Sequence, residues 1–301
     1  MRVASPSTGF ASFLMFASAS IWGLYWLPLR YLEEQGIAGG WAIAAVNLPA
    51  GLVLVPVVLS RWRANTRFFL HAVAIGVLTG SALSLYASGL IYSSVVRATL
   101  LFYLTPVWAT LIGIAWLGEK SSIARWTAIS AGLVGLGMLV SGGGSVPLNI
   151  GDFFALLSGV FWALGAAMIV RFDKVPVPAM TMIQFAVTAL GALAIGALMG
   201  AASLPAATDL IAIMPLSSAI SILIFLPCVV VIFWTQKFLF PGRAGLLMMS
   251  EVLMAVLSAS LLIPEEKLSA IEWGGAVLII GACLFEVLVT SQQDPAALRR
   301  A

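Results

Sequence analysis

The sequence predicts an all-α integral membrane protein with ten transmembrane helices, arranged as two five-helix repeats of inverted topology. Three observations lead to this fold class. Of the 301 residues, 61% are hydrophobic and only 9% are charged, whereas a soluble domain carries roughly 25% charged residues. Long apolar stretches follow one another along nearly the whole chain, and short patterns of the first half recur in the second.

The apolar stretches have the length of membrane spans. A helix needs about 20 predominantly apolar residues to cross a bilayer. Such stretches lie near residues 9–29, 41–60, 70–89, 95–117, 122–140, 152–170, 178–199, 211–234, 244–263 and 270–290. The first resembles a secretory signal, but the spans that follow identify it as the first transmembrane helix. The short connections leave no extramembrane domain for soluble enzymology, and we expect no enzymatic activity.

The basic residues indicate the orientation of the chain. With the N-terminus in the cytoplasm, 12 of the 15 Lys and Arg residues fall at cytoplasmic ends or connections. These are Arg2, Arg61, Arg63, Arg67, Lys120, Arg125, Arg171, Lys174, Lys237, Arg243, Arg299 and Arg300. Only Arg30, Arg97 and Lys267 fall on the other side. Basic residues stay on the cytoplasmic side of a membrane. We therefore expect a protein of the bacterial inner (plasma) membrane with both termini in the cytoplasm.

Short patterns recur in the same order on both sides of the glycine-rich stretch 141–145. The pairs are SASIWG (18–23) with SGVFWA (158–163), RATLL (97–101) with RAGLL (243–247), and LGEK (117–120) with PEEK (264–267). They predict a duplication, with a first repeat at 1–145 and a second at 146–301. Since each repeat has five spans, the second enters the membrane upside down. Inverted repeats are typical of secondary transporters, whose substrate binds near the midplane between the repeats.

The segment TPVWATLIGIAWLGEK (105–120), followed by Trp126 and a glycine-rich span, resembles the EamA domain of the drug/metabolite transporter (DMT) superfamily. Two such domains would cover nearly the whole chain. The second departs from the pattern, because Val252 stands where the first has Pro106. In length, aromatic content and termini, the chain most resembles YddG-type exporters of aromatic and other neutral amino acids. This resemblance implies transport by alternating access.

Nine residues inside the predicted spans are candidates to line a substrate cavity. They are Trp22, Asn47, Tyr86, Thr99, Tyr103, Pro106, Trp162, Gln184 and Glu251. The two tryptophans occupy matching positions, away from the interfaces where tryptophan usually anchors a helix. They could form the walls of a site for a flat solute, or they could simply pack in the core.

For most of the other candidates, two interpretations also remain open. Thr99, Tyr103 and Pro106 share one face of their span, either lining a cavity or forming a kinked packing helix. Tyr86 lies on a face of the third span apart from its small residues. The buried amides of Asn47 and Gln184 need partners in hydrocarbon, and interhelical hydrogen bonds would serve as well as a substrate.

Glu251 is the one carboxylate well inside a predicted span, and no basic residue lies at its depth. Its charged form is therefore disfavoured. It could bind a substrate ammonium group, carry a proton, or remain protonated and hydrogen-bonded. Glu286 lies nearer the cytoplasmic end of its span, and we expect its side chain to extend to the interface.

Several kinds of chemistry are not predicted. Cys228 and Cys283 stand alone in apolar runs, so we expect small hydrophobic side chains rather than a disulfide or metal site. No Walker motif indicates direct use of ATP. We expect no cofactor, no metal and no nucleic-acid partner. The expected partners of a monomeric chain are the lipid bilayer and a small-molecule substrate.

The leading hypothesis is an exporter of amino acids, aromatic and other neutral ones, or of similar small amphiphilic metabolites. One alternative is a flippase of the same fold that moves lipids or polyprenyl-linked substrates. Another is a membrane subunit that does not transport, or a membrane enzyme without a recognisable motif.

Overall fold

All secondary structure in the described residues is helical. The computed structural model describes residues 6–61, 66–93, 98, 101–139, 148–200, 204–262 and 269–288. The helices are α1 (Thr8–Trp22), α2 (Trp26–Glu34), α3 (Gly40–Ser60), α5 (Phe69–Tyr92), α7 (Thr105–Leu117), α8 (Ile123–Leu139), α9 (Ile150–Arg171), α10 (Val177–Leu198), α11 (Ala207–Ile220), the π-helical turn η1 (Ser221–Phe225), α12 (Leu226–Gln236), α13 (Pro241–Met248), α14 (Ser250–Leu262) and α15 (Ala270–Leu288). The all-α class is confirmed for this part of the chain.

Seven helical segments of the described residues are long and apolar enough to cross a membrane. They are Thr8–Glu34, Gly39–Ser60, Phe69–Tyr92, Ile150–Arg171, Val177–Leu198, Ala207–Gln236 and Pro241–Leu262. These segments correspond to predicted spans 1–3 and 6–9. The remaining predicted spans correspond to α7, α8 and α15, with 13, 17 and 19 residues. For these three, the crossing of the membrane stays a prediction.

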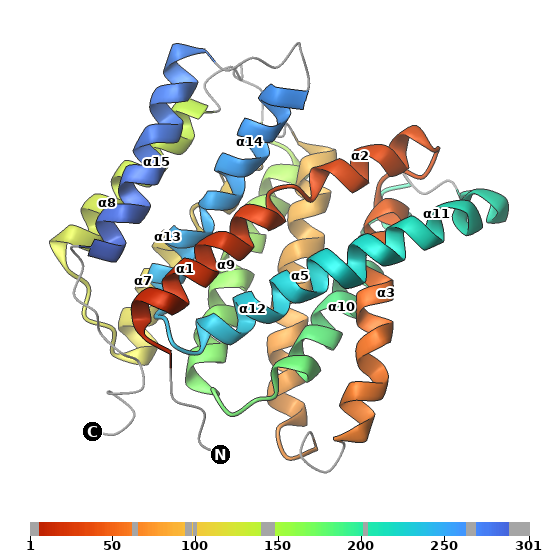
Figure 1. Cartoon of the computed structure of the whole chain (residues 1–301), viewed down its shortest axis with the longest axis horizontal. Helices are drawn as coiled ribbons and strands as arrows, with labels where there is room; N and C mark the ends of the chain where they lie inside the picture. Colours follow the sequence, from red (N-terminus) through yellow and green to blue (C-terminus); the bar gives the residue numbers. More distant parts are fainter. Residues whose placement is uncertain are drawn as a thin grey trace.

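The helices pack in a pattern that relates the two halves. Figure 1 shows α8 and α15 paired on the left and α3, α5 and α10 toward the right, with α1, α9, α13 and α14 between them. The contact of α5 with α9 corresponds to the contact of α12 with α1. Likewise, α7 contacts α9, and its counterparts α13 and α14 contact α1. Exchanging each span with the one five places later therefore preserves these contacts.

Small residues allow the closest helix contacts. A Cβ atom on Gly80 of α5 would lie 2.7 Å from the carbonyl oxygen of Gln184 on α10, and one on Gly76 would lie 2.6 Å from the Ile183 side chain. Only glycine permits this approach, which is how helices associate when lipid removes the hydrophobic driving force.

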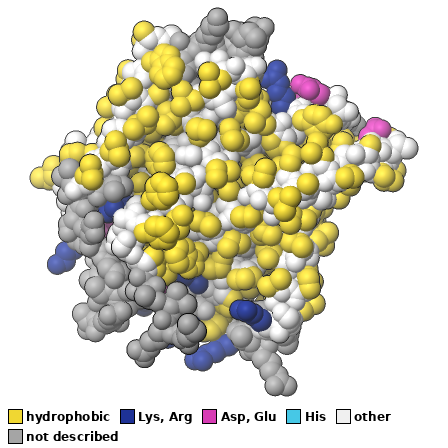
Figure 2. Space-filling view, in the orientation of Figure 1, with side chains coloured by type: hydrophobic (Ala, Val, Ile, Leu, Met, Phe, Trp, Pro, Cys, Tyr) yellow, Lys and Arg dark blue, Asp and Glu magenta, His cyan; other side chains and the backbone are white. Residues whose placement is uncertain are grey.

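The outer surface is mostly hydrophobic. Figure 2 shows a broad apolar face, with charged side chains near its upper and lower margins. Large side chains on this surface include Leu223 at 73% and Val277 at 66% exposure. A continuous apolar surface of this size would be unfavourable in water and suits contact with lipid.

Candidate functional site

A cavity lies where the two halves meet. The hollow measures about 320 Å³, counting space open to its surroundings, and is called the central cavity below. Its walls are Trp22, Leu83, Phe102, Trp162, Val229, Ile232, Met248 and Glu251. The sequence analysis named three of these residues, Trp22, Trp162 and Glu251, and the structure brings them together.

Interrupted helices surround the central cavity. Helix α1 ends at Trp22, and the chain turns at 23–25 before α2 begins. A turn at Tyr103 and Leu104 precedes α7, and Met249 separates α13 from α14. The π-helical turn η1 interrupts the span formed by α11 and α12. Broken and π-helical segments are typical of substrate sites in membrane transporters and of functional sites in general.

The wall at Trp22 is held by neighbouring aromatic rings. Trp22 stacks on Tyr25, with ring centroids 4.9 Å apart, and meets Phe225 edge-on at 5.2 Å. The Asn47 amide donates a hydrogen bond of 2.7 Å to the Tyr25 hydroxyl. Asn47 therefore lies behind this wall and supports it, while its own side-chain oxygen is buried without a partner among the described residues.

The opposite wall is more loosely arranged. Trp162 is 5% exposed, and its nearest aromatic neighbour is Phe233 at 6.3 Å. Beside it, Tyr86 stacks on Phe102 at 4.3 Å, and Phe102 meets Tyr103 edge-on at 4.9 Å. Tyr86 thus supports Phe102, which itself lines the cavity.

Phe102 and Met248 were missed by the sequence analysis, although the repeat contained the signal. Phe102 directly follows the motif RATLL, and Met248 directly follows RAGLL. Both line the central cavity. The offset that relates these motifs also relates Leu83 to Val229, two further cavity residues. Pairs of equivalent residues therefore build most of the cavity wall.

Glu251 is the only charged residue that lines the central cavity within the described part of the chain. Its carboxyl group interacts with the buried hydroxyl of Tyr103, although that hydroxyl has no hydrogen bond of standard geometry to a described residue. Its repeat counterpart is Thr105, whose hydroxyl donates to the carbonyl of Phe102. The second half alone thus supplies the carboxylate.

The remaining candidates lie elsewhere. Pro106 is buried in the first turn of α7, where its Cα would be 3.2 Å from a Cβ atom on Gly245 of α13. Gln184 is fully buried and donates a hydrogen bond of 3.1 Å to Thr188, at the contact of α5 with α10. Thr99 lies outside the described residues.

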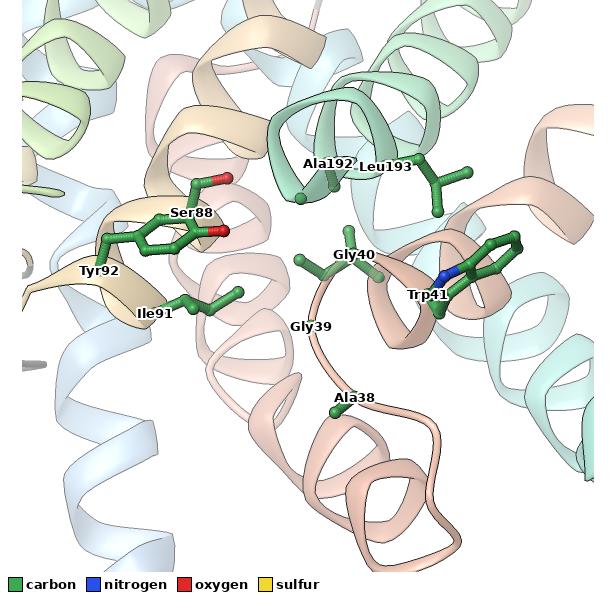
Figure 3. Close-up of a pocket in the computed structure, with 11 residues that line it drawn as sticks. Ala38, Gly39, Gly40, Trp41, Ser88, Ile91, Tyr92, Ala192 and Leu193 are labelled. Carbon is green, nitrogen blue, oxygen red and sulfur yellow. The ribbon is translucent and has the colours of Figure 1, made fainter. Parts of the chain in front are cut away.

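A second hollow of about 400 Å³ lies where α3 begins and α5 and α10 end. Figure 3 shows Trp41, Ser88 and Tyr92 around it, with the chain turning through Gly39. Gly39 has a φ of 59°, a backbone conformation that favours glycine. This hollow contains no charged side chain among its lining residues, so it lacks a group that would orient a charged solute.

Four buried charged residues form a cluster at the end of the bundle where α1 begins and α15 ends. They are Glu119, Arg125, Arg243 and Glu286. The expectation that Glu286 extends to the interface is wrong, because its side chain is 0% exposed and pairs with Arg125. Burial raises the pKa of the Glu119 carboxyl, and the Arg125 guanidinium acts in the opposite direction.

Among the described residues, no group of three or more His, Cys, Asp or Glu side chains could hold a metal ion. Cys228 and Cys283 are both buried free thiols.

Comparisons with known proteins place these features in a family. The model of the EamA-like transporter family matches residues 9–141 and 149–288. A solved structure, a crystal structure of a protein, superposes with a TM-score of 0.71 at 20% identity, covering 97% of this chain and 98% of that one. At this identity the likeness shows the fold alone. No curated protein matches the sequence.

Proposed function

The chain belongs to the EamA-like transporter family, and on this premise we propose that it exports amino acids, aromatic and other neutral ones, or similar small amphiphilic metabolites. Membership in the family makes it a membrane transporter of the drug/metabolite type. In the proposal, substrate binds in the central cavity, which opens alternately to the two sides of the membrane.

One observation carries the choice of substrate: Trp22, Trp162 and Glu251 line the same cavity at the junction of the halves. An aromatic or apolar side chain would lie between the two indole rings, whose faces favour flat partners and cations. The ammonium group of the same molecule would pair with the Glu251 carboxylate.

Flux into proteoliposomes tests the proposal. We expect accumulation of radiolabelled phenylalanine or leucine above that of protein-free liposomes, and loss of phenylalanine flux in Trp162→Ala. Trp116→Ala is the matched control, because Trp116 is 43% exposed on the outer surface and its loss should leave flux unchanged. Movement of headgroup-labelled lipid without amino-acid flux would instead establish the flippase. Chemical change of the solute would establish an enzyme.

We further propose that the protein lies in a bacterial inner membrane with both termini in the cytoplasm. The distribution of basic residues supports this orientation. A thiol introduced by Gly143→Cys should react with an impermeant reagent only from outside, and one introduced by Arg299→Cys only from inside. Both positions lie outside the described residues. Reaction of both thiols from one side would contradict the inverted repeat.

A single chain should suffice for transport, since the described residues of one chain line the whole central cavity. Reconstitution at less than one chain per vesicle should therefore leave the flux per chain constant as the protein-to-lipid ratio falls. A flux that falls with the square of that ratio would require a dimer.

A further inference from the structure

The four buried charges form one connected cluster. Arg125 contacts Glu119 through Nη1 and lies 3.0 Å from Glu286 through Nε. Arg243 interacts electrostatically with Glu286 and donates a hydrogen bond of 3.1 Å to Ser12 of α1. Each charged side chain is at most 5% exposed. Two positive and two negative charges leave the cluster neutral, which is the condition under which buried charges are tolerated.

The backbone is built around this cluster. Gly118 ends α7 in the left-handed conformation, with a φ of 67°, and turns Glu119 back beneath the helix. A Cβ atom on Gly113 would lie 2.0 Å from the Glu119 carboxylate, and one on Gly242 would lie 3.1 Å from the Arg125 guanidinium. Glycine is therefore required at three positions for the charges to meet. The LGE segment (117–119), where α7 ends, thus has a structural role.

The cluster joins both halves of the protein. Glu119 and Arg125 follow α7 and begin α8 in the first half, whereas Arg243 and Glu286 belong to α13 and α15 in the second. Arg243 stands eight residues before Glu251 along the interrupted ninth span, about 12 Å at 1.5 Å per residue. The charges thus fix the end of the same span whose other part lines the central cavity.

The other end of the bundle lacks this arrangement among the described residues. The repeat relates Arg125 to Glu272, each directly preceding the tryptophan after its motif. Glu272 forms only a local capping box: its carboxylate accepts a hydrogen bond from the backbone N–H of Ser269, and its own backbone N–H donates one to the Ser269 hydroxyl. At the first end, paired charges therefore join the two halves. At the other end, the position of Arg125 holds only the locally capped Glu272, and the counterparts of Arg243 and Glu119, which are Arg97 and Glu266, lie outside the described residues.

We propose that Glu119, Arg125, Arg243 and Glu286 form a clamp that closes the predicted cytoplasmic end of the transport pathway and separates when that end opens. The clamp residues are positioning residues, because none of them lines the central cavity. Its separation needs water to replace the lost ion pairs, so opening of this end and hydration of the clamp occur together. The inference rests on the proposed alternating access, but not on which solute is carried.

Thiol accessibility tests the clamp without any substrate. The probe is Val229→Cys in the central cavity, in a background with Cys228→Ala and Cys283→Ala. An impermeant maleimide is added to oriented membrane vesicles from one side at a time. Removing Arg125 and Glu286 together, as Arg125→Leu with Glu286→Leu, keeps the cluster neutral. We expect the labelling rate from the cytoplasmic side to rise about tenfold or more, as a shift of population toward the open state requires.

The matched control is Glu272→Leu at the equivalent position, which should leave that rate unchanged. An unchanged rate in the folded double variant would overturn the proposal and make the cluster purely structural. If the double variant does not fold, Arg125→Lys decides in the same assay. Lysine keeps the charge but loses the two-armed contact, so a rise of roughly threefold is expected, and no rise would overturn the proposal.

The outcome is separable from that of the proposed function. Faster labelling without amino-acid flux would leave the clamp standing and remove the proposed substrates. Amino-acid flux with unchanged labelling would support the proposed function and contradict the clamp.

Discussion

The two halves supply equivalent residues to the central cavity but hold them differently. Trp22 and Trp162 occupy the same position in SASIWG and SGVFWA, yet α1 stops at Trp22 whereas α9 continues past Trp162 to Arg171. Gly23 follows Trp22, and its backbone approaches α14 so closely that a Cβ atom would lie 2.3 Å from the carbonyl oxygen of Glu251. The equivalent residue, Ala163, is buried within a continuous helix.

This difference shows how two equivalent cavity walls, at Trp22 and at Trp162, come to be held in different ways. The first tryptophan belongs to a tight group of three rings at an interrupted helix, which fixes its orientation. The second lies on an unbroken helix with one distant aromatic neighbour. The carboxylate of Glu251 and the clamp charge of Arg125 are likewise present at only one of two equivalent positions. Two symmetric halves thus form an asymmetric site.

The largest expected effect concerns the clamp. Arg125→Leu alone removes the guanidinium that the buried carboxylates of Glu119 and Glu286 share, and breaking a buried ion pair from one side costs about 3–5 kcal/mol. Glu272→Leu, at the equivalent position, loses only a capping box, worth about 1 kcal/mol. Thermal unfolding in detergent measures both. Equal destabilisation by the two variants would remove the asymmetry between the ends.

The interrupted first span gives the next effect. Gly23→Ala places a Cβ atom against the backbone of α14, and overpacking of this kind costs roughly 1–3 kcal/mol. The reciprocal change, Ala163→Gly, introduces glycine into a continuous helix and costs about 1 kcal/mol. Denaturant unfolding followed by circular dichroism compares them. A neutral Gly23→Ala variant would mean that α1 and α14 do not need this close approach.

The variants Trp22→Ala and Trp162→Ala should differ less in stability than the pairs of variants above. Both are nearly buried, at 7% and 5% exposure, and both truncations should reduce the flux of phenylalanine. Trp22→Ala also loses its contacts with Tyr25 and Phe225, and such aromatic pairs contribute about 0.5–1.5 kcal/mol each. We therefore expect Trp22→Ala to be the less stable variant by about 1 kcal/mol. The opposite order in thermal unfolding would show that the ring cluster does not fix this wall.

The smallest effect on stability is expected at Glu251. Glutamine keeps the shape of the side chain and its capacity for hydrogen bonds, so Glu251→Gln should change stability by no more than about 1 kcal/mol. An incoming ammonium group favours the ionised carboxyl group, so we expect binding of substrate to release a proton. Glu251→Gln should therefore abolish any dependence of flux on a proton gradient.

The outcome for Glu251 is read by comparing flux with and without a proton gradient, in wild type and variant. Wild-type flux that ignores the gradient and persists in Glu251→Gln would make Glu251 a structural residue. Thr105→Val is the control from the other half: Thr105 is the counterpart of Glu251 and carries no carboxylate, so this change should not affect the gradient dependence.

Hydropathy and internal repetition predicted much of the fold from the sequence alone. A membrane requires about 20 apolar residues for each crossing, a local property that composition reveals directly. Repeated motifs related distant residues, so Trp22 and Trp162 could be assigned to equivalent walls. Comparing the residues that directly follow RATLL and RAGLL would also have identified Phe102 and Met248.

Tertiary structure alone decided which buried polar groups meet. Asn47 bonds to Tyr25 across two spans, and Glu286 pairs with Arg125 across the two halves. Gln184 instead bonds to Thr188 one turn along its own helix. The helix interruptions were also hidden: span 4 turns before Pro106, but span 9 turns at Met249 without a proline. The physical reason is that each residue rotates by about 100° around a helix, so one interruption changes which side chain faces the cavity. Such interruptions depend on the close approach of neighbouring helices, which no local pattern contains.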